Sequence, residues 1–386
     1  MGPWAESLLA PAAPPGQTVA GMKEPESLQQ VRRTYVRQGG RELSFFSGCD
    51  YFRLSSHPKI LAAVRTGMQR YGLNVAASRR TTGNHAVYLT LEKELCRFYR
   101  AEAALVVSTG YLTNLVVAQA LAGNFSHVLV DEKSHVSPQD GAQFFQCPIL
   151  KFQHREPADL ARVLARCGRG ARPVVLTDGM FSGDGSVAPL KAYLKLLPRD
   201  GLLIVDDAHG GGTIGAHGGG AVEVEAADRH RLVQCVTLSK ALGCYGGAVL
   251  GSPELRERIV QRSSLFIGST PLPLPLAHAA TVALKLLRAD PRLRRRLNAN
   301  ADFVKDSLRR AGMNLPDHPG PAIPFPLPTP AANARLRRAL LAAGIFPSFI
   351  EYLNGPNGGY FRFVISSEHS PTQLKSLVSV LTKFIP

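Results

Sequence analysis

Lys240 stands in the stretch TLSKAL, residues 237–242, directly after an apolar run that is typical of a buried strand. A lysine at the end of a buried strand is costly to desolvate unless its charge is neutralised or paired. A Schiff base between the amine and an aldehyde neutralises that charge and makes the lysine chemically useful. Taken alone, a lysine in a strand-to-loop turn is more often a surface residue, so Lys240 needs partners to support a catalytic role.

Asp206 and His209 are candidate partners, because they end another apolar run, GLLIVDDAH. A buried carboxylate needs a cation or several donors, and the protonated nitrogen of a heteroaromatic ring is one such cation. An aspartate that keeps a pyridine nitrogen protonated makes that ring an electron sink. His209 could then donate a hydrogen bond to a ring oxygen.

Two other interpretations of the DDAH stretch remain open. The aspartate could be salt-bridged and the histidine could cap a loop. Two acidic residues at one strand end could also bind Mg²⁺. The chain has no phosphate-binding GxxxxGK[ST] motif to support a magnesium–nucleotide site.

A phosphate group could bind where the run 104–108 ends and a helix is expected to begin. Backbone N–H groups around Gly110 and Tyr111 can point at an anion there, and Thr237 could add a hydroxyl. His135 could lie flat on the face of a ring. A lysine amine, an acid for the ring nitrogen, a donor for the phenolic oxygen and a phosphate cup are what pyridoxal 5′-phosphate (PLP) requires.

The elements that must position these groups are short apolar runs separated by helical stretches. The strand-like runs are 104–108, 127–132, 173–179, 201–209, 232–239 and 246–252. This alternation predicts a mostly parallel sheet covered by helices on both faces. Ligands bind beyond the carboxyl ends of strands in such sheets. The polar groups at those ends are Thr109-Gly110, Asp131 to His135, Asp178 to Ser182, Asp206 to His209, and Thr237 to Lys240.

Four segments are expected along the chain: a loose tail over 1–22, a helical segment over 23–70, a large domain over 71–275 and a small α+β domain over 276–386. Helices are predicted from Glu24 to about Arg37 and over 51–72, the latter with Pro58 in its first turn. Ser370 and Pro371 mark the start of the last helix, and a Pro-rich stretch over 315–330 predicts a loop with an edge strand.

Composition narrows the class of protein. The net charge of +16 could indicate nucleic-acid binding, but the basic residues are scattered rather than clustered, which argues against it and is compatible with an anionic substrate. The six cysteines lack the spacing of a zinc site and indicate a reduced, cytoplasmic protein. No stretch is apolar for long enough to span a membrane.

Motifs from about residue 44 to the C-terminus resemble those of the α-oxoamine synthases, which include 8-amino-7-oxononanoate synthase and glycine C-acetyltransferase. The matching segments include STGYLTN, DEKSHVS, TDGMFSGDGSVAPL, IVDDAHGGGTIGAHGGG, TLSKALGCYGG, FIGSTPLPLP and YFRFVISSEHS. These enzymes belong to the PLP fold-type I, or aspartate aminotransferase-like, group. The resemblance implies a mostly parallel α/β sheet between helices, a smaller α+β C-terminal domain and PLP as cofactor.

The resemblance also implies a role for each site residue. Lys240 would form the Schiff base, Asp206 would pair with the pyridine nitrogen, and His135 would stack on the ring. The remaining implied roles are His209 and Ser182 at the ring oxygen, Gly110, Tyr111 and Thr237 at the phosphate, Ser269 and Thr270 at the phosphate of the partner subunit, and Arg362 at the substrate carboxylate. The active unit would therefore be a homodimer with shared sites.

The implied reaction is the condensation of an amino acid with an acyl-CoA or an acyl-carrier thioester, usually with decarboxylation, to an α-amino ketone. Alanine and a long-chain acyl thioester are the default substrates. Two rivals differ in class. One is another fold-type I enzyme, such as an aminotransferase, a lyase or a secondary-metabolite synthase, which would release no CoA thiol. The other is a non-enzymatic basic protein, which a complete Lys–Asp–His set disfavours.

Three departures from the family pattern surround the expected substrate pocket. Cys49 stands where the family usually has an Asn that approaches the substrate. Asp178 stands where the family commonly has Glu. Arg79 and Arg80 could form an anion site or could be surface charge. These changes leave the cofactor set complete, so the sequence predicts the cofactor more firmly than the substrate.

Overall fold

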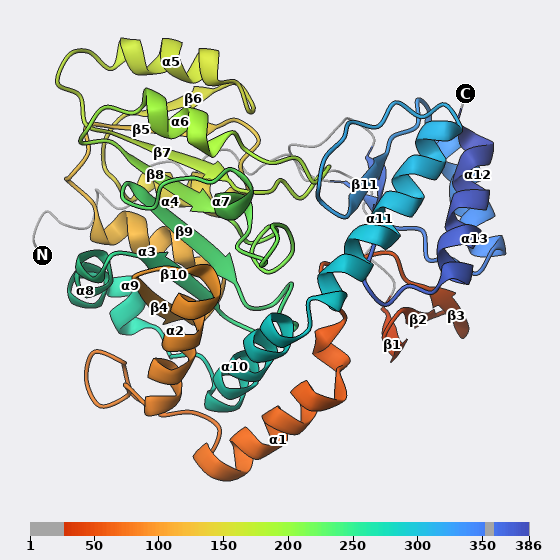
Figure 1. Ribbon diagram of the computed structural model, residues 1–386, viewed down its shortest axis with the longest axis horizontal. Coiled ribbons are helices and arrows are strands. Elements are labelled where there is room, and N and C mark those ends of the chain that lie inside the picture. Colours follow the sequence, from red (N-terminus) through yellow and green to blue (C-terminus); the bar gives the residue numbers. More distant parts are fainter. Residues whose placement is uncertain (1–26, 352–358, 386) are drawn as a thin grey trace, which may run out of the picture.

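A seven-stranded sheet forms the centre of the larger of two bodies in the computed structural model, which describes residues 27–351 and 359–385 (Figure 1). The tail predicted for 1–22 lies outside the described residues. The strands, in chain order, are β4 (Ala103–Val107), β5 (His127–Asp131), β6 (Ile149–Phe152), β7 (Pro173–Asp178), β8 (Leu202–Asp206), β9 (Leu232–Thr237) and β10 (Gly247–Gly251). Their order across the sheet is β4-β10-β9-β8-β7-β5-β6.

The predicted mostly parallel sheet is confirmed. Strands β9, β8, β7, β5 and β6 run parallel, and β10 alone pairs antiparallel with both of its neighbours, β4 and β9. Only β6 among these strands had no counterpart among the predicted runs. Because β4 and the parallel strands end at the same edge, the residues that follow them gather at one place.

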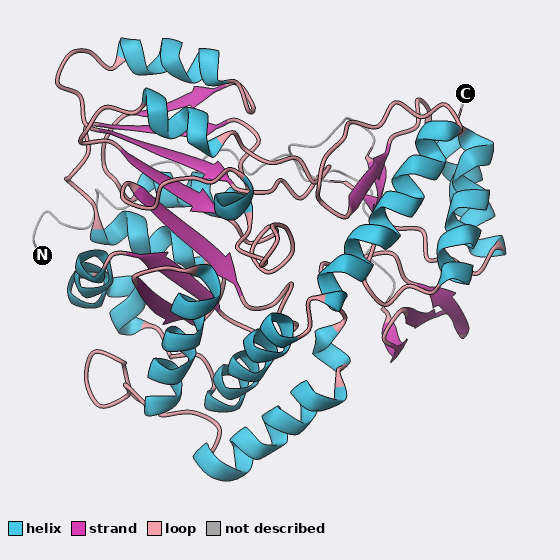
Figure 2. Ribbon diagram, viewed as in Figure 1, coloured by secondary structure: helices cyan, strands magenta, loops and turns pink. Residues whose placement is uncertain are grey.

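Helices cover both faces of this sheet, as Figure 2 shows. One face carries α3 (Leu112–Ala120), α4 (Val136–Gln143), α8 (Pro253–Arg262) and α9 (Ser264–Gly268). The other carries α2 (Ala86–Tyr99), α5 (Pro157–Arg166), α6 (Leu190–Leu196), α7 (Ala221–Val224) and α10 (Leu274–Ala289), with α1 (Pro58–Tyr71) packed on α10. Leu91, Leu95 and Phe98 are buried on one stripe of α2, as the periodicity predicts.

The strands are buried on both faces because successive side chains point to opposite sides. In β8, Leu203 and Val205 enter the core beneath α5 and α6, whereas Ile204 enters the core beneath α3 and α4. This explains why the strands read as continuous apolar runs rather than as alternating ones.

The smaller body contains a three-stranded sheet in the order β11-β13-β12. Its strands are β11 (Ala322–Phe325), β12 (Phe349–Ile350) and β13 (Tyr360–Val364), and its helices are α11 (Arg292–Arg310), α12 (Pro330–Ala342) and α13 (Pro371–Leu381). The edge strand predicted in the Pro-rich stretch is β11. Ser370 caps α13 in a capping box with Gln373, so the predicted start of the last helix is confirmed.

The helix predicted from Glu24 to about Arg37 is wrong for the part that the structure describes. Residues 29–44 form an antiparallel sheet of β1 (Gln29–Arg32), β2 (Tyr35–Gln38) and β3 (Arg41–Ser44). It lies beside α13 in Figure 1, and Ser44 N donates to Gly344 O over 2.7 Å. The strands pair with one another across a turn at Gly39-Gly40, so a local hairpin signal outweighs helix propensity here. The helix predicted within 51–72, with its cap near Ser56 or His57, is α1, and its N-cap at His57 and Pro58 in its first turn are confirmed.

The packed cores suggest where the two bodies divide. Buried side chains of α10 and the first turns of α11 join the core of the large sheet, whereas Phe46 and residues from Ala301 onward form a separate core. We propose that the small domain comprises about 29–46 and the chain beyond the middle of α11. This division differs from the boundary expected at 275/276, because apolar residues of α10 pack on α1 and α2.

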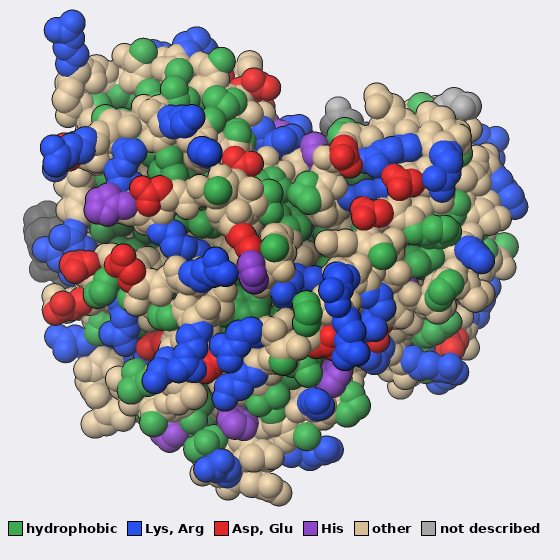
Figure 3. Space-filling view, viewed as in Figure 1, with side chains coloured by type: hydrophobic (Ala, Val, Ile, Leu, Met, Phe, Trp, Pro, Cys, Tyr) green, Lys and Arg blue, Asp and Glu red, His purple; other side chains and the backbone are tan. Residues whose placement is uncertain are grey.

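Surface charge and membrane spans can be compared with the sequence expectations. Figure 3 shows Lys and Arg side chains spread over both bodies on the face in view. Within the ranges 27–351 and 359–385, no helix combines the length and the apolar character that crossing a membrane requires. All six cysteines are free thiols.

Candidate active site

A cavity of about 240 Å³ opens at the carboxyl edge of the large sheet. Most of its lining follows directly on the strand ends that the sequence singled out: Thr109, Gly110, Tyr111, His135, Ser137, Asp178, Asp206, Ala208, His209, Thr237, Ser239, Lys240, Tyr245 and Gly246. The structure thus brings residues from β4, β5, β7, β8 and β9 to one place.

Lys240 and His209 face each other in this cavity. Lys240 Nζ lies 2.8 Å from His209 Nε2, and His209 Nδ1 lies 2.7 Å from the hydroxyl of Tyr51. Burial lowers the pKa of Lys240, which favours a neutral, nucleophilic amine. Burial and the charge of Lys240 lower the pKa of His209 well below its usual range, so this imidazole stays neutral.

The carboxylate of Asp206 is held in a fixed orientation. Its Oδ2 accepts a hydrogen bond from Asn114 Nδ2 over 2.7 Å, and its Oδ1 accepts one from Ala208 N over 3.1 Å. Asn114 Nδ2 also donates to Ser137 Oγ over 2.9 Å, which fixes the amide. These donors stabilise the carboxylate and still leave it on the wall of the cavity.

Asp178 is the second acidic residue in the cavity wall. Its Oδ1 accepts the backbone N–H of His135 over 2.9 Å, which anchors the loop that begins α4. Burial and the nearby Asp206 raise the pKa of Asp178 well above its usual range. Burial thus favours the protonated form of the Asp178 carboxyl group.

The predicted phosphate region lies at the start of α3. A Cβ atom at Gly110 would lie 2.6 Å from Thr237 Oγ1, so only glycine lets these two loops approach so closely. At the start of α3, Leu112 N donates to Thr109 Oγ1 over 3.4 Å and Thr113 N donates to Gly110 O over 3.2 Å, while Gly110, Tyr111 and Thr237 line this end of the cavity. Tyr111 carries an exposed ring whose hydroxyl bonds to Asp140.

Three predicted residues lie on other parts of the chain and are not among the residues that line the cavity: Arg362, Cys49 and Ser182. Arg362 lies on β13 of the small sheet, and after burial its charge is a further cause of the lowered pKa of Lys240 and of His209. Its Nη1 donates to the carbonyl of Ser182 over 3.2 Å. Cys49 forms a hydrogen bond with Tyr51. Ser182 does not line the cavity, so its predicted contact with the ring oxygen stays a prediction.

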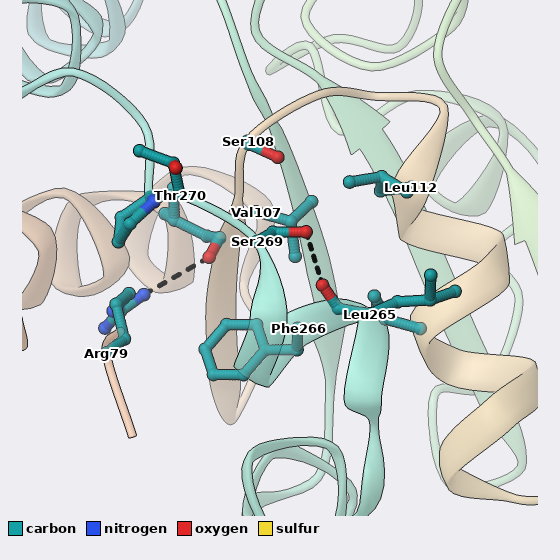
Figure 4. A pocket seen from close by; sticks show the side chains of 11 residues that line it. Arg79, Val107, Ser108, Leu112, Leu265, Phe266, Ser269 and Thr270 are labelled. Atoms are coloured by element: carbon teal, nitrogen blue, oxygen red, sulfur yellow. Dashed lines mark hydrogen bonds between the residues drawn. The ribbon is translucent and has the colours of Figure 1, made fainter. Parts of the chain in front are cut away.

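Ser269 and Thr270 lie apart from Lys240, in a small pocket that also contains Arg79 and Phe266 (Figure 4). The hydroxyl of Ser269 donates to Leu265 O. Only one chain is described here, so the predicted contact of Thr270 with a partner subunit stays a prediction.

The sequence left two interpretations of Arg79 open, an anion site and a surface charge. The structure supports neither of them. Arg79 is buried, and its Nη1 lies 2.6 Å from Glu92 Oε1. The same guanidinium donates to Asn84 and to Val106 O. The guanidinium of Arg79 is therefore hydrogen-bonded and ion-paired within the chain, whereas Arg80 is exposed.

Sequence reasoning missed Tyr51 and Asn114. Asn114 is a polar residue directly before the apolar run LVVA, and a buried amide there signals a specific partner. Tyr51 carried no such signal, because it stands in an irregular segment 158 positions from His209.

Comparisons with known proteins agree with this arrangement. The model of the family "Aminotransferase class I and II" matches residues 48–381. The chain is 33% identical to the 8-amino-7-oxononanoate synthase of Thioalkalivibrio sulfidiphilus, covering 89% of this chain and 88% of that one. It is 35% identical to the enzyme of the same name from Methylococcus capsulatus, covering 94% and 93%.

Among solved structures, a serine palmitoyltransferase from S. paucimobilis superposes with a TM-score of 0.86 at 25% identity, covering 92% of each chain. The match to the aminotransferase family and the identity to two enzymes of one name extend over the cavity and both bodies. The chain therefore belongs to the aminotransferase class I and II family and, within it, to the α-oxoamine synthases.

Proposed function

We propose that the protein is a PLP-dependent C-acyltransferase that condenses an amino acid with an acyl-CoA or acyl-carrier thioester. The product would be an α-amino ketone, with loss of the thiol and, usually, of CO₂. The observation that carries this proposal is the meeting of Lys240, Asp206 and His209 on one cavity. Alanine and a long-chain acyl thioester are the proposed substrates, as for an 8-amino-7-oxononanoate synthase.

The chemistry of the donor set fits PLP. Lys240 supplies an amine of lowered pKa, which suits Schiff-base formation with an aldehyde. Asp206 is a carboxylate fixed by Asn114, which suits a pyridinium nitrogen. The close approach of Gly110 and Thr237 at the helix start suits a phosphate. The S. paucimobilis neighbour was solved with PLP and myriocin bound.

When bound, PLP supplies an electron sink for the charge that develops on the amino-acid Cα. The residues of the chain then orient and move protons. Lys240 Nζ would take the Cα proton, and the lowered pKa that burial gives its amine supports this role. His209 remains a neutral donor or acceptor beside it. Arg362 would bind the substrate carboxylate through its guanidinium fork.

The remaining roles are part of the same proposal. His135, at the N-cap of α4, would cover one face of the cofactor, and Cys49 would contact the amino acid or the acyl group. Thr270 would contact the phosphate of the partner subunit in a homodimer. We also propose a cytoplasmic location, which the six free thiols support.

The visible absorbance spectrum of the PLP-loaded protein tests the proposal. Glycine, alanine, serine and larger amino acids are added one at a time, followed by acyl-CoA with thiol release monitored. A band that shifts with one amino acid, followed by thiol release, is the expected result. A band that shifts without thiol release would exclude acyl transfer from CoA and favour an aminotransferase or a lyase. A protein that does not bind PLP would overturn the proposal.

A further inference from the structure

Tyr51 connects the segment before α1 to the imidazole of His209. Its hydroxyl lies 2.7 Å from His209 Nδ1, and the two rings meet edge to face at 66°. On the other side of the imidazole, Nε2 lies 2.8 Å from Lys240 Nζ. Tyr51, His209 and Lys240 thus form one hydrogen-bonded row that begins outside the cavity and ends at its amine.

The position of Tyr51 is fixed by its backbone. Its N–H donates to Cys49 O and its carbonyl accepts from Ser367 N, each over 2.9 Å. The next turn is tied to the loop of Lys240, because a Cβ atom at Gly243 would overlap the backbone of Leu54. Gly243 has a φ of 59°, in the left-handed region that favours glycine. Tyr51 and Lys240 are therefore held in a constant relation.

The pairing of Tyr51 is not a general property of buried tyrosines in this protein. The hydroxyls of Tyr99 and Tyr193 are also buried, yet they have no hydrogen-bond partner among the described residues. The hydroxyl of Tyr51, by contrast, meets both the imidazole and the thiol of Cys49.

A neutral imidazole has one nitrogen that donates and one that accepts, and the partner of one nitrogen decides the role of the other. A hydroxyl can donate or accept. When Tyr51 donates to Nδ1, Nε2 carries the proton and donates into the cavity. When Lys240 is an ammonium and donates to Nε2, Nδ1 carries the proton and donates a hydrogen bond to the Tyr51 hydroxyl. Tyr51 satisfies the buried Nδ1 in both cases.

Building on the proposed function, we propose that Tyr51 is a positioning residue that orients His209 toward Lys240 by supplying the hydrogen-bond partner of Nδ1. The charged and titratable groups around this row are Lys240, Arg362, His135 and Cys49. Burial raises the pKa of Tyr51 well above its usual value, so the row ends in a hydroxyl rather than a phenolate. Phe at position 51 would leave Nδ1 buried without a partner.

The test compares Tyr51→Phe with Tyr193→Phe, which removes a buried hydroxyl that has no partner in the described structure. The ¹⁵N chemical shifts of the His209 ring are measured near neutral pH in ¹⁵N-histidine-labelled protein, with and without PLP. His209→Gln assigns the resonances, and the thermal unfolding midpoint shows that each variant is folded. We expect the same ring shifts in the wild type and in Tyr193→Phe, and a moved Nδ1 shift in Tyr51→Phe, because Nδ1 loses its hydrogen-bond partner.

The dissociation constant of PLP gives a second readout. We expect it to rise about tenfold in Tyr51→Phe, because a buried nitrogen loses its partner, and to stay unchanged in Tyr193→Phe. Should Tyr51→Phe match Tyr193→Phe in both measurements, the positioning role would be refuted. The shifts of the cofactor-free protein decide the question even if the wild type neither binds PLP nor releases thiol, an outcome that would reject only the proposed function.

Discussion

Two groups of charged residues differ in how their charges are paired. Around Arg79, the buried charges pair within the chain: Glu92 accepts from Arg79 through Oε1 and from Arg256 through Oε2. Around Lys240, the side chains of Lys240 and Asp206 line one open cavity, and Lys240 Nζ bonds to the imidazole of His209 rather than to a carboxylate. The first group stabilises the fold, whereas the second remains available to a ligand.

Lys240→Ala gives the largest expected effect. Removing the amine should lower kcat/KM for thiol release by about 10³- to 10⁴-fold, because the proposed function makes this residue both the attachment point of the cofactor and the base. Stability should change little, since the amine bonds to a neutral imidazole and not to a buried carboxylate. Steady-state kinetics and the unfolding midpoint measure the two properties. A variant that keeps activity would remove Lys240 from the chemistry.

Glu92→Gln should produce the opposite result. Breaking a buried ion pair leaves Arg79 charged and uncompensated, so the free energy of unfolding should fall by about 3–5 kcal/mol. Chemical denaturation measures it. Glu94→Gln on the same helix is the matched control, because Glu94 pairs with Arg97 and Arg288, which are 53% and 48% exposed, and should cost about 1 kcal/mol or less. Equal losses in both variants would contradict the contrast between the two groups.

Arg362→Lys tests whether the guanidinium of this β13 residue binds the substrate carboxylate. The ammonium keeps the charge but loses the guanidinium fork, so KM for the amino acid should rise about 10- to 100-fold with a smaller change in kcat. The spectral titration with amino acid gives the binding constant independently. An unchanged KM would show that another group binds the carboxylate.

Asn114→Ala should have the smallest effect of this set. Asp206 would keep the N–H of Ala208 but lose the side-chain donor, and about one hydrogen bond to a charged group corresponds to a roughly tenfold weaker affinity for PLP. Equilibrium dialysis of PLP measures it. Gln119→Ala is the matched control, because Gln119 lies on the same helix as Asn114 but contacts Ser263, Ser264 and Leu265 instead of Asp206. It should leave the affinity for PLP unchanged.

The sequence by itself predicted the central sheet and the polar groups at its edge. Both follow from local patterns, since an apolar run that ends in Asp, His or Lys indicates a strand and the place where it stops. Because parallel strands end at the same edge, the sequence could predict that Gly110, Asp178, Asp206 and Lys240 lie close together, although it could not predict which side chains touch. The resemblance to the α-oxoamine synthases, which indicated the cofactor and the family, also depends on short local motifs.

Tertiary structure alone decided the contacts that depend on distant pairing. The structural role of Arg79 follows from its ion pair with Glu92, which the sequence did not reveal. Tyr51 joins the site only through its contact with His209, 158 positions away. The strands at 29–44 pair mainly with one another across a local turn at Gly39-Gly40, and the contact of Ser44 with residues 344–346 attaches them to the C-terminal body. Such pairings depend on the closure of long loops and on burial in three dimensions, neither of which is encoded in the spacing of nearby residues.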